Sequence, residues 1–272
     1  MRMNFTVKTD VWTRDFAARS PIFELLRTLE VCSSEDWPDV ETMQKLVRDA
    51  GLITADGKAV SLLPQIAGAL RTPYEKTLFE KGEMGFRERN WHDFFNVLAC
   101  VVFPLVKSAL NARHYAALGL EAPGKRGSER DALTLFDESG VIVLGPRHLL
   151  AHIRAFEWHE LFWRERESVC RDMRFFIFGH ALYEKSLEPY VGMTGHALLV
   201  ETDSLVLREA SDIDAHVAGM IRSRVLDDAS ALSPLPLLGI PGWWRENENE
   251  QFYANERYFR RGRSRKKMSP DI

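Results

Sequence analysis

The sequence predicts an α+β fold: a mostly helical single domain with a few short strands and hairpins. Apolar residues recur at helical spacing along most of the chain, while strand-like runs are short and border turn residues. The chain has 272 residues, 45% of them apolar and 28% charged, which suffices for one continuous hydrophobic core and is typical of a folded protein. Disordered, collagen-like, coiled-coil and multi-span membrane architectures are therefore disfavoured.

Residues 1–73 are expected to form an N-terminal helical segment with a small hairpin. A short helix should begin at Ser20, because this N-cap serine precedes a proline at the first helical position. A second helix should cover residues 40–47, where apolar side chains recur at helical spacing, and should end before Gly51, which suits a C-cap. An Asp-Gly turn then predicts the hairpin within residues 52–61.

The helical pattern resumes from Asn90 to about Tyr115. A bend is expected near Pro104, because its ring removes a backbone donor and crowds the preceding turn. The apolar run at residues 94–106 is shorter than the roughly 20 residues of a membrane-crossing helix, so it predicts a buried helix instead. Residues 119–130 mix glycine and proline with charges, which indicates an exposed connection and an internal boundary.

A second hairpin is predicted at residues 133–144, with the string Asp137-Glu138-Ser139-Gly140 as its turn. The two adjacent carboxylates are interpreted as turn residues, because aspartate, serine and glycine are favoured in turns for backbone reasons. Helices should then dominate from about His148 to Leu187.

A strand is expected at residues 197–201, with residues 205–207 as a candidate extension. A helix should follow it, beginning at Ser211 with Asp214 three positions later, which resembles a capping box. The remaining residues are rich in proline and aromatic side chains, and they predict irregular structure.

The end of the chain carries a concentration of positive charge. Seven basic residues occur there with no acid among them: Arg257, Arg260, Arg261, Arg263, Arg265, Lys266 and Lys267. The net charge is −3, and without these seven the balance would be 29 basic against 39 acidic residues. A disordered tail at residues 261–272 could bind nucleic acid through counterion release. The alternative is a solvated terminus that aids solubility.

The cysteines and the N-terminus favour a cytoplasmic location without a membrane partner. Cys32, Cys100 and Cys170 are odd in number and far apart, and they form no CxxC pair, which fits a reducing compartment. The first residues lack the apolar run of a secretory signal. The sequence does not indicate an oligomeric state.

His180 and Glu184 form the first candidate catalytic site. On a helix over residues 173–187, His180 falls at the centre of an apolar face and Glu184 lies one turn further on. A histidine and a glutamate at this spacing can together hold a metal ion or orient a proton-transfer group. The alternative is an interior histidine whose ring makes a structural hydrogen bond.

The string Asn90-Trp91-His92-Asp93-Phe94-Phe95-Asn96 carries the second candidate site. Its aromatic side chains belong to one helix face, which leaves His92, Asp93 and Asn96 on the other side. If that side lines a cleft, His92 and Asp93 are catalytic candidates and Asn96 is a binding candidate. The alternative is a capped helix start whose polar residues face water.

Two further groups are candidate binding residues. Glu160 and Arg164 continue an apolar helix face with charges, and they would form either a pocket network or an ordinary ion pair. Near the C-terminus, aromatic and amide side chains could stack on a base or sugar, or they could clamp an irregular strap onto the core. This second group is Trp243, Asn247 and Tyr253.

Four segments occur in an order that resembles the bacterial family called domain of unknown function 3025. They are the string at 90–96, Phe136-Asp137-Glu138-Ser139-Gly140, Phe178-Gly179-His180-Ala181 with Glu184, and Gly239-Ile240-Pro241-Gly242-Trp243. The first is the most distinctive. The resemblance covers about Tyr74 to Arg260, and it implies a core domain at residues 74–260 in a bacterial intracellular protein. The family supplies no mechanism.

Three functions remain open. In the first, the His92 and Asp93 helix start packs against His180 and Glu184 to form a hydrolase site for a small-molecule substrate. This site would use one divalent metal ion, or it would work without metal with His180 as general base; Arg164 or Asn96 would stabilise charge.

The second function is non-catalytic binding of nucleic acid or a ribonucleoprotein through the C-terminal aromatic residues and the basic tail. The third is a structural or interaction protein, in which the polar strings are only caps and core hydrogen bonds.

Overall fold

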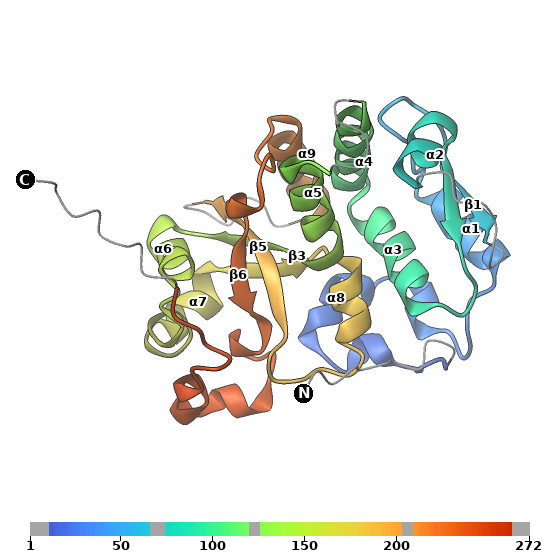
Figure 1. Cartoon of the computed structure of the whole chain (residues 1–272). Helices are drawn as coiled ribbons and strands as arrows, with labels where there is room; N and C mark the ends of the chain where they lie inside the picture. Colours follow the sequence, from blue (N-terminus) through green and yellow to red (C-terminus); the bar gives the residue numbers. More distant parts are fainter. Residues whose placement is uncertain (1–10, 66–73, 120–125, 203–208, 263–272) are drawn as a thin grey trace, which may run out of the picture.

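The structure, a computed structural model, describes residues 11–65, 74–119, 126–202 and 209–262. It confirms the predicted α+β class, with helices packed around small sheets (Figure 1). The α-helices are α1 Val40–Asp49, α2 Tyr74–Lys81, α3 Trp91–Val102, α4 Pro104–Leu118, α5 Ser128–Ser139, α6 Arg147–Ala155, α7 Arg166–Asp172, α8 His180–Lys185 and α9 Ala210–Arg222. The strands are β1 Ser61–Pro64, β2 Glu83–Phe86, β3 Gly140–Gly145, β4 Arg174–Ile177, β5 Thr194–Glu201 and β6 Ser233–Pro236.

The central sheet has four strands in the order β4-β3-β5-β6. β3 runs parallel to β5, with Val141 opposite Ala197, while β4 and β6 run antiparallel to their neighbours. Every residue of β3 is buried. A strand that is covered on both faces is expected to be continuously apolar, and this explains the run Val-Ile-Val-Leu within β3.

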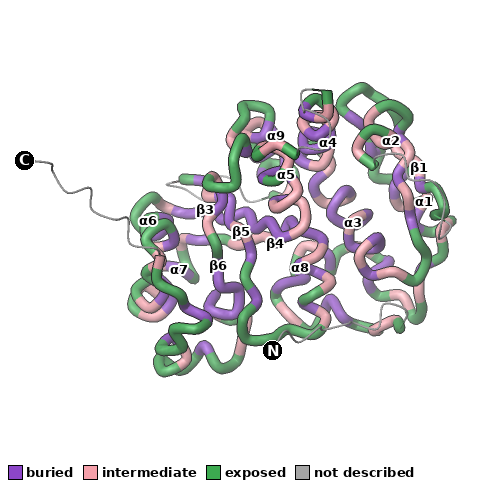
Figure 2. Tube along the Cα trace, viewed as in Figure 1, coloured by how far each residue is buried: buried purple, intermediate pink, exposed green. Residues whose placement is uncertain are grey.

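The two faces of the central sheet pack against different apolar clusters. Val141 belongs to a cluster with α3 and α6, whereas Ile142, the next residue, belongs to one with α4, α5 and α9. Figure 2 shows that the central strands and much of α3 are buried. The first cluster extends from Phe16 to Phe259, so the N-terminal segment packs into the same core as the C-terminal part.

Two of the predicted N-terminal elements are present. The Ser20 side chain accepts a hydrogen bond from the Ile22 amide and begins a short 3₁₀-helix at Pro21–Leu26. α1 ends just before Gly51, which has a φ of +61°. The hairpin at 52–61 is reduced to an isolated bridge between Ile53 and Ala59, and β1 instead pairs in parallel with β2.

The predicted hairpin at residues 133–144 is wrong in its first half. Residues 133–139 belong to α5, and only the segment from Gly140 onward is a strand. The short apolar run before Asp137 fits a helix as well as a strand, because Leu133 and Phe136 also share a helix face. As a result, Asp137 and Glu138 project from the last turn of a helix and not from a solvent-exposed turn.

Helices dominate from His148 to Leu187 as predicted, but the single helix expected over residues 173–187 is wrong. After α6 and α7, residues 174–177 form β4 on the edge of the central sheet, and α8 begins only at His180. The segment Arg-Phe-Phe-Ile gains backbone hydrogen bonds by pairing with β3. Its aromatic residues and isoleucine suit a strand, so sheet pairing overrides the apparent helical spacing.

The bend predicted near Pro104 is a complete break between α3 and α4, and the helix pair is bent there by 111°. Pro104 occupies the first position of α4, where its missing amide costs nothing. The Asp214 carboxylate accepts hydrogen bonds from the amides of Leu105 and Val106 at 2.9 and 2.8 Å. Asp214 therefore caps α4, and the capping box predicted for it at Ser211 is wrong.

The strand predicted at 197–201 lies within β5, whereas residues 205–207 fall outside the described residues. The same is true of residues 120–125 in the predicted connection and of 263–272 in the basic tail. Within the described ranges, no single helix has the length and apolar character to cross a membrane; α3 and α4 meet that criterion only as a bent pair.

Candidate functional site

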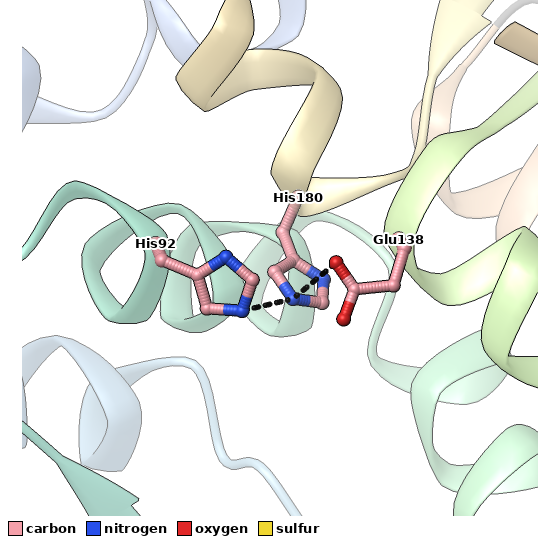
Figure 3. Close-up of side chains that lie close together, drawn as sticks. All are labelled: His92, Glu138 and His180. Atoms are coloured by element: carbon pink, nitrogen blue, oxygen red, sulfur yellow. Dashed lines mark hydrogen bonds and ion pairs between the residues drawn. The ribbon is translucent and has the colours of Figure 1, made fainter. Parts of the chain in front are cut away.

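Three side chains from separate helices meet in the structure: His92, Glu138 and His180 (Figure 3). His92 lies in the first turn of α3, Glu138 in the last turn of α5, and His180 at the start of α8. The Nε2 atoms of the two histidines lie 3.0 Å apart, and His180 Nε2 lies 3.7 Å from Glu138 Oε2. One ligand atom from each residue lies within 4.8 Å of the others.

Gly179 brings the start of α8 close to the end of α5. A Cβ on this residue would lie 2.5 Å from the backbone nitrogens of Ser139 and Gly140, so glycine is required. The amides of Phe178 and Gly179 donate to the Gly140 carbonyl at 3.0 and 2.9 Å. This close approach places His180 beside the carboxylates at the end of α5.

Each histidine has a carboxylate near its second ring nitrogen. His92 Nδ1 lies 3.2 Å from Glu184 Oε2, and His180 Nδ1 lies 3.8 Å from Asp137 Oδ2. The hydrogen bond with Glu184 raises the pKa of His92 above its usual value, although burial opposes this. Burial, reinforced by the Lys107 ammonium, lowers the pKa of His180 to about 3, so this ring is neutral near pH 7.

The two Nε2 atoms lie so close together that a positive charge between them, from a proton or a metal ion, would be stabilising. A proton on His92 Nδ1 can be donated to Glu184, and a proton on His180 Nδ1 faces Asp137. In these tautomers both Nε2 atoms present lone pairs to each other at 3.0 Å, which is repulsive unless a proton or a metal ion lies between them. In metal sites, a carboxylate that accepts the second ring proton of a ligating histidine fixes its tautomer. Glu184 can do this for His92, whereas His180 Nδ1 has no hydrogen-bond partner among the described residues.

Lys107 of α4 connects the cluster to neighbouring side chains. Its ammonium donates to Asp137 Oδ1 at 2.6 Å and to Asn96 Oδ1 at 2.8 Å, and it lies 5.3 Å from the centre of the Phe178 ring. Burial disfavours the charged lysine, but the negative charge of Asp137 outweighs burial and raises the pKa of Lys107. The lysine is therefore charged.

The pKa values of the two carboxylates at the end of α5 move in opposite directions. Burial opposes ionisation of both. For Asp137, the Lys107 ammonium outweighs burial and lowers the pKa below its usual value. For Glu138, burial dominates and raises the pKa, against the opposing charge of His92. Ionisation is therefore less favourable for Glu138 than for Asp137.

The cluster opens into a cavity of about 1100 Å³. Its polar end includes one face of α4, where Lys107, Asn111 and His114 recur at helical spacing. Asn111 Oδ1 and His114 Nδ1 are buried and have no hydrogen-bond partner in the part of the chain that the structure describes. A cavity of this size with converging polar groups is typical of a small-molecule site.

Asp93 and Asn96 lie in the cavity wall beside the cluster. The Arg87 guanidinium donates to both carboxylate oxygens of Asp93, at 2.8 and 2.7 Å, and the Arg87 amide donates to one of them at 2.8 Å. These are the contacts of a structural ion pair. Asn96 accepts from Lys107 and donates to the Tyr74 hydroxyl at 3.4 Å, so it helps to position the lysine.

Glu160 and Arg164 do not line the cavity. Both are exposed, and they bound a single turn of π-helix at Glu160–Arg164. No ion pair joins these two described side chains, because the wider π turn does not give residues four apart the stacking of an α-helix.

The C-terminal aromatic and amide residues are also outside the cavity. The buried Asn247 amide donates to the carbonyls of Leu238 and Ile240 at 2.9 and 2.7 Å, and the Tyr253 hydroxyl donates to a third carbonyl of that segment at 3.0 Å. Trp243 packs edge-on against a phenylalanine of β4. These contacts match the alternative of a strap clamped onto the core.

Three members of the site were not predicted from the sequence: Lys107, Asp137 and Glu138. The hairpin interpretation assigned the two carboxylates to a turn. Lys107 could have been found as the first residue of a polar stripe with Asn111 and His114, because residues four and seven positions further on share a helix face.

A family model with the description "Protein of unknown function (DUF3025)" matches residues 61–263. The matched region contains His92, Glu138 and His180, together with the carboxylates behind the two histidines. Comparison with curated proteins and with solved structures finds no match. Since the family model covers most of the chain, this protein belongs to the family of unknown function DUF3025.

Proposed function

We propose that the cavity is the active site of a hydrolase that uses one divalent cation held by His92 Nε2, His180 Nε2 and the Glu138 carboxylate. The observation that carries the proposal is the convergence of these three ligand atoms within 4.8 Å. Two imidazoles and one carboxylate leave coordination positions free for water and substrate, as in catalytic zinc sites. A cation bound there would lower the pKa of a water molecule and polarise the bond to be cleaved.

The charges around the cluster favour a divalent cation. When a cation and not a proton lies between the two rings, both rings are neutral. Asp137, Glu138 and Glu184 then supply three negative charges, against the positive charges of Lys107 and Lys185. An excess of negative charge in a partly buried site is unfavourable without a counterion, and a divalent cation would supply that counterion.

The neighbouring side chains have positioning roles in this proposal. Glu184 holds the proton on His92 Nδ1, which leaves the Nε2 lone pair free for the cation. Lys107 holds Asp137 in place. The Lys107 charge also lies close enough to affect the pKa values of His180 and Glu138, so it can stabilise negative charge that develops on a substrate.

Metal loading combined with turnover tests the proposal. The full chain would be stripped with EDTA, reloaded with Zn²⁺ or Mn²⁺, and assayed against nitrophenyl esters and phosphates. We expect one bound cation per chain and activity that depends on it. His92→Ala and Glu138→Gln should each abolish both, with circular dichroism confirming that the variants are folded.

His159→Ala is the matched control, because His159 also contacts a carboxylate, Glu250 at 2.9 Å, but lies outside the cavity. This control should bind the cation and turn over substrate as the unmodified chain does. The proposal is overturned if no cation binds at one-to-one stoichiometry, or if turnover is unaffected by EDTA and by Glu138→Gln.

A further inference from the structure

Besides the polar cluster, the cavity is lined by a group of apolar side chains. This apolar side comes from the region between α1 and β1, from the β1–β2 pair and from α2. In Figure 1, α1, β1 and α2 lie together at one end of the molecule. The apolar side includes Leu52, Ile53, Val60, Leu63, Leu78 and Met84. The catalytic cluster and an apolar wall therefore belong to one continuous space.

Several apolar side chains on this side are exposed to solvent. Ile53 is 57% exposed, Leu63 42% and Tyr74 36%, and all three line the cavity. They come from three different elements: the bridge that follows α1, strand β1 and the start of α2. Single exposed apolar residues are ordinary on protein surfaces, but a group that borders one cavity indicates a binding surface for an apolar ligand.

Tyr74 connects this apolar surface to the polar cluster. Its ring is partly exposed, while its hydroxyl accepts a hydrogen bond from Asn96 at 3.4 Å. Asn96 in turn accepts from Lys107 at 2.8 Å, and Lys107 donates to Asp137 beside His180. The apolar surface thus leads, through two side chains, to the lysine next to the proposed cation site.

We propose that the substrate is amphipathic, with an apolar acyl chain lying against Ile53, Leu63 and Tyr74 and an ester or amide group reaching the cluster. The identity of the cleaved bond rests on the proposed function, whereas binding of the acyl chain to the apolar surface does not. In the reaction, water oxygen bonds to the acyl carbon and the bond from that carbon to the ester oxygen or amide nitrogen breaks. The leaving group takes one proton, and the acid product releases the other.

Binding of neutral amides of different chain length tests the proposal without requiring turnover. Octanamide and butanamide would be compared on the full chain by ligand-observed NMR. Because burial of each additional methylene favours binding, octanamide should bind about tenfold more tightly or better. Equal affinity for the two amides overturns the proposal.

Leu63→Ser tests whether the exposed apolar residues contact the acyl chain. Ile53→Thr is a second variant that tests the same surface on a different element. Each should reduce the preference for octanamide severalfold and leave the affinity for butanamide unchanged. Leu105→Ser is the matched control, because Leu105 is 44% exposed but does not line the cavity. If Leu105→Ser reduces the preference as much as Leu63→Ser does, the assignment of the surface is wrong.

Different results would contradict the hydrolase proposal and the amphipathic-substrate proposal. Chain-length-dependent amide binding without cation-dependent turnover would retain the apolar surface and remove the hydrolase. Cation-dependent ester hydrolysis with the same kcat/KM for butanoyl and octanoyl esters would retain the hydrolase and remove the amphipathic substrate.

Discussion

His92 and Glu184 contact each other across 92 positions of sequence, with His92 Nδ1 lying 3.2 Å from Glu184 Oε2. This contact joins the start of α3 to α8 and turns the other ring nitrogen of His92 toward His180. The orientation of the proposed cation ligand therefore depends on a carboxylate that does not itself belong to the ligand cluster.

Glu184→Gln is expected to weaken cation binding without removing a ligand. The amide is similar in size but has no charge to hold the proton on His92 Nδ1, so the Zn²⁺ affinity should fall by about 10- to 100-fold. Isothermal titration with Zn²⁺ measures this. Glu188→Gln, at an exposed position shortly after α8, is the control, and an equal loss in both variants would contradict a specific role for Glu184.

Gly179→Ala should destabilise the fold, because its Cβ would come within 2.6 Å of backbone atoms at the end of α5. We expect a loss of about 1 to 3 kcal/mol in the free energy of unfolding, measured by urea denaturation. Gly219→Ala, in the interior of α9 with open space around the added Cβ, should instead be stabilising by about 0.5 to 1 kcal/mol. A neutral or stabilising effect of Gly179→Ala would show that the close approach at Gly179 is not needed.

Asp214→Ala should remove the cap of α4. Two backbone amides would lose their acceptor, and the expected cost is about 0.5 to 2 kcal/mol in the free energy of unfolding. Asp49→Ala removes an exposed aspartate at the end of α1 and should change stability by less than about 0.5 kcal/mol. Thermal unfolding of both variants measures these changes in stability. Equal stability of the two variants would argue against a capping role for Asp214.

The three cysteines should differ in reactivity. Burial raises the pKa of Cys32 to about 12 and that of Cys100 to about 11, so their thiolates are scarce at pH 8, whereas Cys170 is exposed. Ellman's reagent should label one thiol rapidly in the native protein. Cys170→Ser should eliminate that fast phase, and a remaining fast phase in this variant would be inconsistent with the burial of the other two.

Much of the fold followed from local sequence signals. The Ser20 cap, α1 with Gly51 after it, and the helix that begins after Asn90 depend on contacts within a few residues. The Asn90 side chain accepts from the Asp93 amide at 3.0 Å, as expected of a helix start. Such contacts can be predicted because the interacting groups are neighbours in the chain.

The elements that were wrong depend on distant partners. β4 forms because it pairs with β3, and α5 continues through Asp137 and Glu138 because its apolar face packs beneath the sheet. The sequence analysis predicted that the segments around His92 and His180 pack together. It expected Glu184 to act with His180, on the same helix. Because α8 begins only at His180, the His180 side chain faces the end of α5. Glu184 lies one turn further along α8 and contacts His92.

Anomalous X-ray diffraction at the zinc edge, from crystals of the full chain grown with Zn²⁺, tests the central claim most directly. The account predicts one strong anomalous peak about 2.0 to 2.2 Å from His92 Nε2, His180 Nε2 and a Glu138 oxygen. Crystals with no peak there, and with the two Nε2 atoms still about 3.0 Å apart, would contradict it.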